Sequence, residues 1–317
     1  MSALFMRRWM PLIVLIGLCI AIGVIEPRFL SLDNLVRVLS SASMPLVIAL
    51  GATFIIIMGS IDLSIEGSLA FSGAVIVSFL SGPASIGVDL GVFAALMGVL
   101  AAALFGALIG WIHVRAQIPS FMASLGMGFV GIGIATLILG GERVPVANDL
   151  IRSLSLGRLM GVPLNVYVAG AMFALAWYIQ YHTLLGRHIV ALGGGEDLAR
   201  ASGVNIRRTR IAAFALAGLF FGVGATLACA KLGAASAMIG SGQLFAAISA
   251  VVVGGTALTG GQGGVVNTLV GVLIVMVIGN GMIIIGLPTY VQQGVLGAAV
   301  IVAVLLNMSG KKPALVK

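Results

Sequence analysis

Ten long apolar runs, separated by short polar segments, constrain this chain more than any other feature. A helix needs about 20 apolar residues to cross a bilayer, and most of the runs approach that length. Only 8% of the residues are charged and 60% are hydrophobic, whereas a soluble domain carries roughly 25% charged residues. We therefore predict one all-α membrane domain over residues 1–317, a polytopic bundle of about ten transmembrane helices near 11–25, 44–59, 66–80, 88–112, 121–140, 162–181, 211–230, 243–258, 265–286 and 290–307.

The basic residues predict how this bundle is oriented. With both chain ends in the cytoplasm, most of the 17 basic residues fall on the cytoplasmic side, as the positive-inside rule requires. Trp9, Trp111 and Trp177 fall at the same side, where an interfacial belt would place them. Arg7 and Arg8 precede the first run, which we interpret as an uncleaved helix in preference to a signal peptide. The cytoplasmic set is Arg7, Arg8, Arg115, Arg187, Arg200, Arg207, Arg208, Arg210, Lys311, Lys312 and Lys317.

The sequence offers no set of residues suited to catalysis or metal binding. Cys19 and Cys229 lie in apolar runs, as small buried hydrophobic residues do. Gly310-Lys311 is not followed by Ser or Thr, so the phosphate-binding loop is absent. We expect no enzyme activity and no cofactor on this chain. The net charge of +8 fits basic loops beside lipid head groups, and we expect no nucleic acid partner.

Two glycine-rich segments, 59–67 and 254–264, interrupt the apolar sequence. Paired, glycine-interrupted spans indicate a transport pathway, because non-helical backbone at membrane depth is stable only inside protein or beside a wet cavity. Apolar runs flank both segments, which suggests an internal repeat with an offset of about 195 residues. The alignment pairs Gly59, Leu63 and Ser64 with Gly254, Leu258 and Thr259.

Polar residues in and near these segments are candidates for lining a path. Asp62 and Glu66 are four residues apart and would share one face of a helix, and an acid inside the membrane is a functional hypothesis by default. Alternatively, Asp62 caps a helix that begins at Leu63, with Glu66 near its first turn. The candidate path residues are Asp62, Ser64, Glu66, Thr256, Asn267, Asn280 and Gln292.

The polar loop at about 182–210 predicts a short helix on the cytoplasmic face. The three glycines at 193–195 read as a helix breaker, and two acids follow them in what would be a first turn. Gly203 is suited to a C-terminal cap. A short helix presented in this way is suited to contact with a partner protein.

Several stretches of the chain match motifs of one known family. Segment 59–67, Gly-Ser-Ile-Asp-Leu-Ser-Ile-Glu-Gly, is similar to its Gly-x-Asp-Leu-Ser-x-Gly signature, with Glu66 as an extra residue. Segment 186–214 is similar to its cytoplasmic loop, although Gly195 replaces a common asparagine and Arg200 stands near an alanine. Segments 251–271, 279–281 and 290–293 match its late glycine-rich stretch and its last stretch. The chain therefore resembles the permeases of bacterial ABC importers of the ribose/xylose/galactoside class.

The resemblance implies a multi-pass permease of the bacterial inner membrane that imports a monosaccharide or similar polar solute. It implies three kinds of partner: a second permease chain, the same or homologous, ATP-binding subunits that carry ATP and Mg²⁺, and a periplasmic substrate-binding protein. The departure at Glu66 suggests pairing with a different permease. Residues implied to couple the chain to the ATPase are Gly194, Glu196, Asp197, Ala199, Arg200, Ser202 and Gly203.

Other functions stay open beside this one. Within the same family, the substrate could be a polyol, a nucleoside or a branched-chain amino acid. A stand-alone ion-coupled secondary transporter is supported by the suggested repeat and by Asp62 and Glu66. The sequence lacks the dense set of buried charges that proton-driven carriers use, which favours energy from another subunit. A scaffold or receptor has no use for two interrupted spans.

Overall fold

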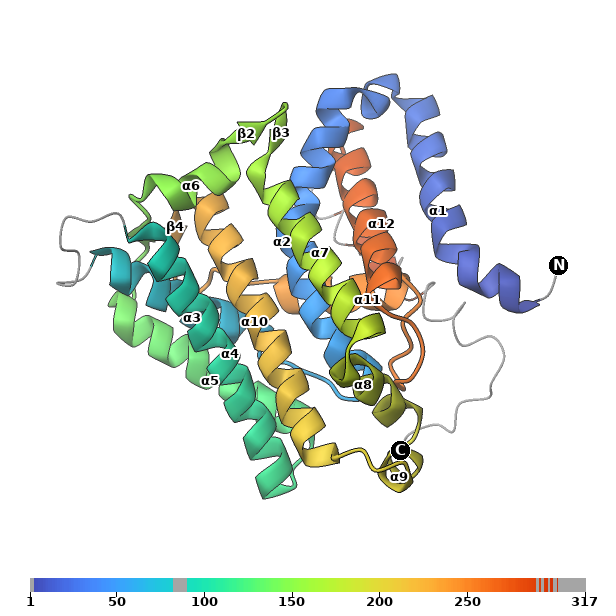
Figure 1. Ribbon diagram of the computed structural model, residues 1–317. Coiled ribbons are helices and arrows are strands. Elements are labelled where there is room, and N and C mark those ends of the chain that lie inside the picture. The colour runs from blue at the N-terminus through green and yellow to red at the C-terminus, as the bar shows by residue number, and fades with distance from the viewer. Residues whose placement is uncertain are drawn as a thin grey trace.

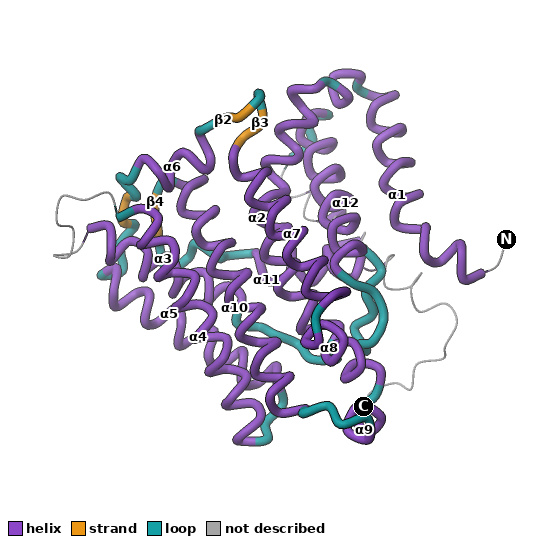
Figure 2. The backbone as a smooth tube through the Cα atoms, in the orientation of Figure 1, coloured by secondary structure: helices purple, strands orange, loops and turns teal. Residues whose placement is uncertain are grey.

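The computed structural model describes residues 3–81 and 90–288, with positions 291, 294, 295, 297, 298 and 301. These residues form a bundle of helices joined by short loops (Figure 1, Figure 2). Four two-residue strands make two small antiparallel ladders, β1 (Val144–Pro145) with β4 (Ala234–Ala235) and β2 (Arg158–Leu159) with β3 (Val162–Pro163). The helices are α1 (Ala3–Ile25), η1 (Pro27–Leu30), α2 (Leu32–Ile57), α3 (Ile65–Ser81), α4 (Gly91–Ala116), α5 (Ser120–Leu139), α6 (Asp149–Leu156), α7 (Leu164–His182), α8 (Leu184–Gly194), α9 (Glu196–Ala201), α10 (Ile206–Leu232), α11 (Gln243–Val253) and α12 (Val265–Ile284).

The predicted all-α, polytopic fold is confirmed. Nine of the ten predicted spans coincide with a helix, and the tenth, 290–307, lies mostly outside the described residues. Within the described residues, five helices are long and apolar enough to cross a membrane: α2, α4, α5, α10 and α12. Shorter apolar helices lie at Trp9–Ile25, Ile65–Leu80 and Gln243–Val253. The last two of these flank the two predicted interruptions, which explains why they are short.

Several of the predicted boundaries are wrong. α1 begins at Ala3 and α10 at Ile206, ahead of the predicted 11 and 211, and α2 and α11 also differ. α2 begins well before residue 44, because Ser31 caps it by accepting a hydrogen bond from the Asn34 backbone N–H through its side-chain oxygen, at 3.3 Å. α11 ends at Val253, whereas the apolar run continues to residue 258. Apolar composition therefore locates the spans, and polar caps and glycines decide where the helices start and stop.

Close glycine packing holds the centre of the bundle together. Gly106 and Gly110 of α4 lie against the α10 backbone near Phe214 and Ile211, and Gly218 and Gly222 of α10 lie against the α4 backbone near Ala102 and Val99. A Cβ added at any of the four glycines would overlap the opposite helix. Two glycines four residues apart allow helix backbones to approach closely in lipid, where van der Waals contact supplies much of the association energy. α2 lies beside α10, α7 and α12 (Figure 1) and is buried along most of its length.

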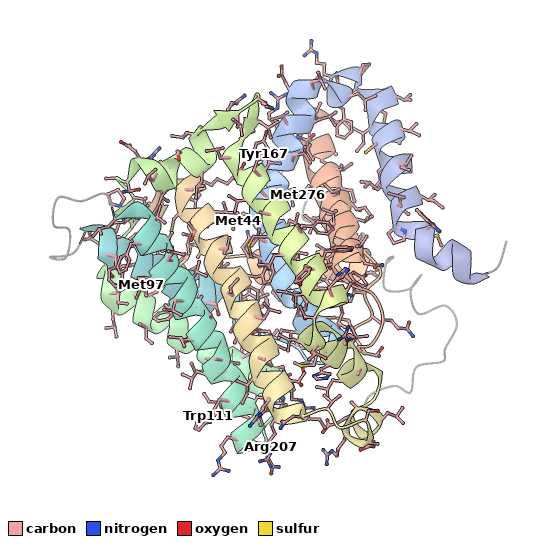
Figure 3. The ribbon with its side chains drawn as sticks, in the orientation of Figure 1. Met44, Met97, Trp111, Tyr167, Arg207 and Met276 are labelled. Atoms are coloured by element: carbon pink, nitrogen blue, oxygen red, sulfur yellow. The ribbon has the colours of Figure 1, made fainter. Side chains whose placement is uncertain are left out.

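The two ends of the bundle carry different loops. At one end, here called the α9 end, the start of α10 packs beside the end of α4, and Figure 3 shows Trp111 and Arg207 there. The opposite end, called the α6 end, holds α6 and the two strand ladders (Figure 1). Arg143 bonds the Leu232 carbonyl there, at 2.9 Å. Of the basic residues assigned to the cytoplasm on sequence grounds, Arg115, Arg200, Arg207, Arg208 and Arg210 lie at the α9 end, and Lys311, Lys312 and Lys317 lie outside the described residues. The cytoplasmic orientation of this end stays a prediction.

Candidate functional site

The polar loop at the α9 end folds into two short helices. Thr183 caps α8, since its hydroxyl accepts a hydrogen bond from the Gly186 N–H at 3.2 Å. α8 continues through Gly193 and Gly194, so the expected three-glycine breaker is wrong in part: the helix ends only at Gly195, whose φ is +157°. The predicted short helix is α9, at the extreme of the α9 end (Figure 1).

Gly203 terminates α9 as the sequence predicts. Its φ is +81°, a left-handed conformation that glycine adopts without steric cost. The Gly203 N–H donates to the Arg200 carbonyl, and the Val204 N–H donates to the Ala199 carbonyl, each at 3.0 Å. These two bonds form the Schellman motif. Gly203 therefore fixes where the chain leaves α9 and turns toward α10.

One carboxylate joins α9 to the first turn of α10. Glu196 bonds Arg200 at 3.0 Å and Arg210 at 2.7 Å. Arg200, which was predicted to couple the chain to the ATPase, and Arg210, which was assigned to the cytoplasmic side, therefore each have an acidic partner within the chain. Arg207 and Arg208 lie exposed on the same turn of α10 and remain available to lipid phosphate or to another protein. Glu196 thus orients α9 on the bundle.

The exposed residues of α9 and of the turn after it differ at two positions from the residues predicted to contact the ATPase. Ala199 is buried against the bundle, with 2% of its surface exposed. Asp197, Arg200 and Ser202 are exposed, as contact with a partner requires. Leu198, which was not predicted to take part, is 74% exposed. Leu198 is the large apolar side chain of a six-residue helix that otherwise carries charged residues and alanines.

The two glycine-rich interruptions begin with the same local structure. After α2, the Ser60 N–H donates to the Ile55 carbonyl at 3.0 Å, and Gly59 has a φ of +79°. After α11, the Thr256 N–H donates to the Val251 carbonyl at 3.2 Å, and the preceding glycine has a φ of +96°. Both ends are Schellman motifs. The geometry pairs Gly59 with Gly255, one residue away from the sequence alignment with Gly254.

Side chains of α5 satisfy the backbone of the first interruption, residues 58–64. The Ile61 N–H donates to the Ser120 hydroxyl at 3.2 Å, and the Leu63 N–H donates to the Ser124 hydroxyl at 2.9 Å. The Asp62 carboxylate accepts from the Ser64 N–H at 2.8 Å and from its hydroxyl at 2.6 Å. Unpaired backbone groups are costly at this depth, so these bonds hold the unwound segment.

Asp62 and Ser64 are therefore engaged with each other inside the protein. Asp62 is 5% exposed and Ser64 is fully buried. Asp62 precedes the helix, which begins at Ile65 and not at Leu63, so it is not on a shared helical face with Glu66. Among the described residues, the ion pairs involve Glu196 alone, and Asp62 has no cationic partner there.

The second interruption, residues 254–264, is stabilised from α7 and α12. The Val265 N–H donates to the Gln180 side-chain oxygen at 2.8 Å, and the Gly264 N–H donates to the Thr256 hydroxyl at 3.2 Å. Asn267 donates its amide to the Gly254 carbonyl at 3.0 Å. Thr256 and Asn267, both predicted to line a path, thus also hold the broken backbone.

Glu66, in the first turn of α3, connects the helix after the first interruption to the helix before the second. Its carboxylate accepts a hydrogen bond from the Gly242 N–H at 2.8 Å, at the start of α11. A carboxylate at a helix N-terminus is favourable because the helix dipole is positive there. Glu66, the extra residue in the signature-like segment, therefore has a structural partner within its own chain.

Asn280 and Gln292 are the last two candidate path residues. Asn280 of α12 exchanges two hydrogen bonds with Asn34 of α2, at 2.9 and 3.2 Å. Asn34 is 1% exposed and also donates to the Phe29 carbonyl, so the amide pair fastens α12 to α2. Gln292 lies outside the described residues.

A half-open cavity of about 230 Å³ lies beside the second interruption. Gly254, Val266 and Asn267 form one side of it. Trp9 and Tyr181 contribute aromatic surface from α1 and α7. Asn267 is thus a predicted path residue that does border open space.

Sequence reasoning missed the residues that satisfy the two interruptions from other helices. Gln180, Ser120 and Ser124 are all buried. In the sequence, each of them is only a polar residue in or at the end of an apolar run. The same pattern fits a side chain that forms a hydrogen bond to the backbone of its own helix. Ser120 and Ser124 do carry one further hint, since a spacing of four places both hydroxyls on one helical face.

Comparisons with known proteins identify the family. The family described as branched-chain amino acid transport system / permease component matches residues 34–305. The ribose import permease protein RbsC of Escherichia coli (strain K12) is 34% identical over 312 residues, which cover 96% of this chain and 95% of that protein. The probable ABC transporter permease protein YphD of the same strain is 36% identical, over 92% of this chain and 89% of its own length. The D-allose transport system permease protein AlsC, also from strain K12, is 29% identical, over 96% of this chain and 93% of its own.

These similarities extend over nearly the whole helical bundle, including both interruptions and α9. They agree with the apolar helices in assigning a multi-pass protein of the bacterial inner membrane. The chain therefore belongs to the permease-component family of ABC importers, a family of transporter subunits and not of enzymes.

Proposed function

We propose that this chain is the transmembrane subunit of an ATP-driven importer that moves a monosaccharide or similar polar solute from periplasm to cytoplasm. The observation that carries the proposal is the position of α9. This helix lies at the extreme of the α9 end, where basic residues gather, and the helix before it, α8, packs against both interruptions. Relatives named as ribose and D-allose permeases support the substrate class. ATP and Mg²⁺ would bind a separate subunit.

The coupling surface follows from the geometry of α9. Leu198 would insert into an apolar groove of the ATP-binding subunit, with Asp197 and Arg200 at its rim. Glu196 and Arg210 would keep α9 attached to α10 when the groove moves α9, because their ion pair joins the two helices at 2.7 Å. A second permease chain and a periplasmic binding protein would complete the importer. The sequence suggested a different partner permease because of Glu66. Since Glu66 is bonded within its own chain, it gives no reason for a different partner, and we propose a homodimer before a heterodimer.

A purification of the chain with its partners tests the coupling surface. In mild detergent, we expect the wild-type chain to retain an ATP-binding subunit and Leu198→Asp to lose it, because a charge replaces the apolar contact. Leu156→Asp is the matched control, since Leu156 is 66% exposed on α6 at the opposite end. Equal retention by both variants would remove Leu198 and α9 from the coupling surface.

A stand-alone secondary transporter remains the second candidate, favoured by one observation. Asp62 is a buried carboxylate at an interruption and has no cationic partner among the described residues, as an ion-coupling site would require. Its two bonds from Ser64 give it a structural task as well. Uptake by the purified chain alone, driven by an ion gradient in liposomes, would favour this candidate over the importer.

A further inference from the structure

Three glycine segments from distant parts of the chain meet beside α8. They are Gly59 in the first interruption, Gly193 in α8, and Gly260 with Gly261 in the second interruption; we call these four residues the glycine junction. A Cβ added at Gly260 would lie 2.8 Å from the Gly59 nitrogen and 3.0 Å from the Gly193 Cα. The junction therefore has backbone against backbone on all three sides, with no side chain between them.

A hydrogen bond locks the two interruptions to each other at this point. The Gly261 N–H donates to the Ile57 carbonyl, the last residue of α2, at 2.8 Å. A Cβ at Gly193 would overlap both the Ile57 oxygen and the Gly261 nitrogen. A Cβ at Gly261 would in turn lie 2.9 Å from the Gly193 oxygen. The end of α8 thus sits against the bond that joins the two interruptions.

Contacts this close do not leave room for independent movement. Packed protein interiors resist continuous deformation and shift between discrete arrangements. α8 is anchored by Ile189 and Leu192, which are 1% and 5% exposed. Only Gly195 separates α8 from α9. A displacement of α9 would therefore move the end of α8 against the glycine junction.

We infer that the glycine junction is the positioning element through which α9 moves both interrupted membrane segments together. The inference rests on the proposed function, because it presupposes that an ATP-binding subunit moves α9. It assigns Gly193 a role that none of the motifs indicates: because Gly193 has no side chain, the α8 backbone can contact both interruptions directly and transmit the movement. An allosteric coupling of this kind is commonly worth about 5- to 150-fold in the affected equilibrium.

Gly193→Ala in the complete, reconstituted importer tests the inference. The added methyl group should push α8 away from Ile57 and Gly261, so we expect ATP hydrolysis to continue while sugar uptake per ATP falls about tenfold. Retention of the ATP-binding subunit during purification checks that α9 still docks. Gly170→Ala is the matched control, because Gly170 is a helical glycine with open space around its Cβ position, and it should couple as the wild type does.

A second measurement needs no variant and covers the case in which Gly193→Ala does not fold. In the wild-type importer, hydrogen exchange at 58–61, 190–195 and 259–262 should change together when ATP binds the partner subunit. The Gly261 amide is the central probe, since it bonds the Ile57 carbonyl. Exchange that changes in α8 while both interruptions stay constant would overturn the inference, as would normal uptake per ATP in Gly193→Ala.

The inference and the proposed function fail in different ways. If the wild-type chain neither retains an ATP-binding subunit nor takes up sugar with ATP, the proposed function is wrong. If the wild type does both, and Gly193→Ala also does both with unchanged uptake per ATP, only the role of the glycine junction is wrong.

Discussion

The two interruptions begin alike and are completed differently. Both follow a Schellman motif with a glycine in the left-handed region, Gly59 in one and Gly255 in the other. Helix then resumes at Ile65 in the first and at Val265 in the second, so the second interruption is longer. A shared start with a different length is what an internal repeat gives when one copy has gained residues.

The partners of the two segments explain why they differ. The first interruption is bonded to hydroxyls of α5 and to its own Asp62 carboxylate. The second is bonded to Gln180 at the end of α7, and α7 leads directly into α8. The second interruption is thus linked to the coupling region both by Gln180 and by the glycine junction. Within the described part of the chain, the first interruption reaches that region through the glycine junction.

The largest expected effect on stability tests whether the two interruptions begin with the same local structure. Gly59→Val and Gly255→Val each place a β-branched residue at positive φ, which we expect to lower the free energy of unfolding by roughly 3 kcal/mol. Thermal unfolding in detergent measures both. Gly133→Val on α5 is the control, because its Cβ position meets no neighbour. If only one of the two variants is destabilised, the interruptions do not share their local structure.

The next effect separates the two interruptions. Gln180→Leu leaves the Val265 N–H without its acceptor in a buried position, so we expect a loss of about 2 kcal/mol. Gln262→Leu, in the same interruption but with an exposed side chain, should be near neutral. Because Gln180 supports only the second interruption, hydrogen exchange should quicken at 263–266 and stay constant at 60–64. Faster exchange in both would show that they unfold as one unit.

A smaller effect is expected at the first interruption. Ser124→Ala removes the acceptor of the Leu63 N–H, a neutral hydrogen bond worth about 1 kcal/mol. The change should raise exchange at 60–64 and leave 263–266 as in the wild type. A stability loss as large as that of Gln180→Leu would contradict the view that the first interruption depends on several weaker bonds.

The smallest effect is expected at Asp62. Asparagine keeps a side-chain oxygen that can accept both bonds from Ser64, so Asp62→Asn should change the free energy of unfolding by less than about 1 kcal/mol. If Asp62 serves only the turn, ATP-driven uptake should stay near the wild-type rate. A large loss of uptake in a stably folded Asp62→Asn variant would return Asp62 to the translocation path.

Much of the fold could be predicted because its determinants are local. Apolar runs identify spanning helices, and Gly203 ends α9 as predicted because positive φ at a helix end is a property of one residue. The bonds that hold the interruptions could not be predicted. Gln180 and Val265 come from separate parts of the chain, and only the folded bundle brings them together. For the same reason Gly193 reads as part of a breaker in the sequence and proves to be a packing contact.

One measurement tests the central claim most directly. Proteoliposomes would contain the purified chain and its candidate ATP-binding subunit. The periplasmic binding protein and labelled ribose would be on the side of the bilayer that the α6 end faces, and ATP would be on the side that the α9 end faces. The account predicts uptake that requires both ATP and the ATP-binding subunit, and that is lost in Leu198→Asp. Uptake by the chain without that subunit, driven by an ion gradient, would contradict it.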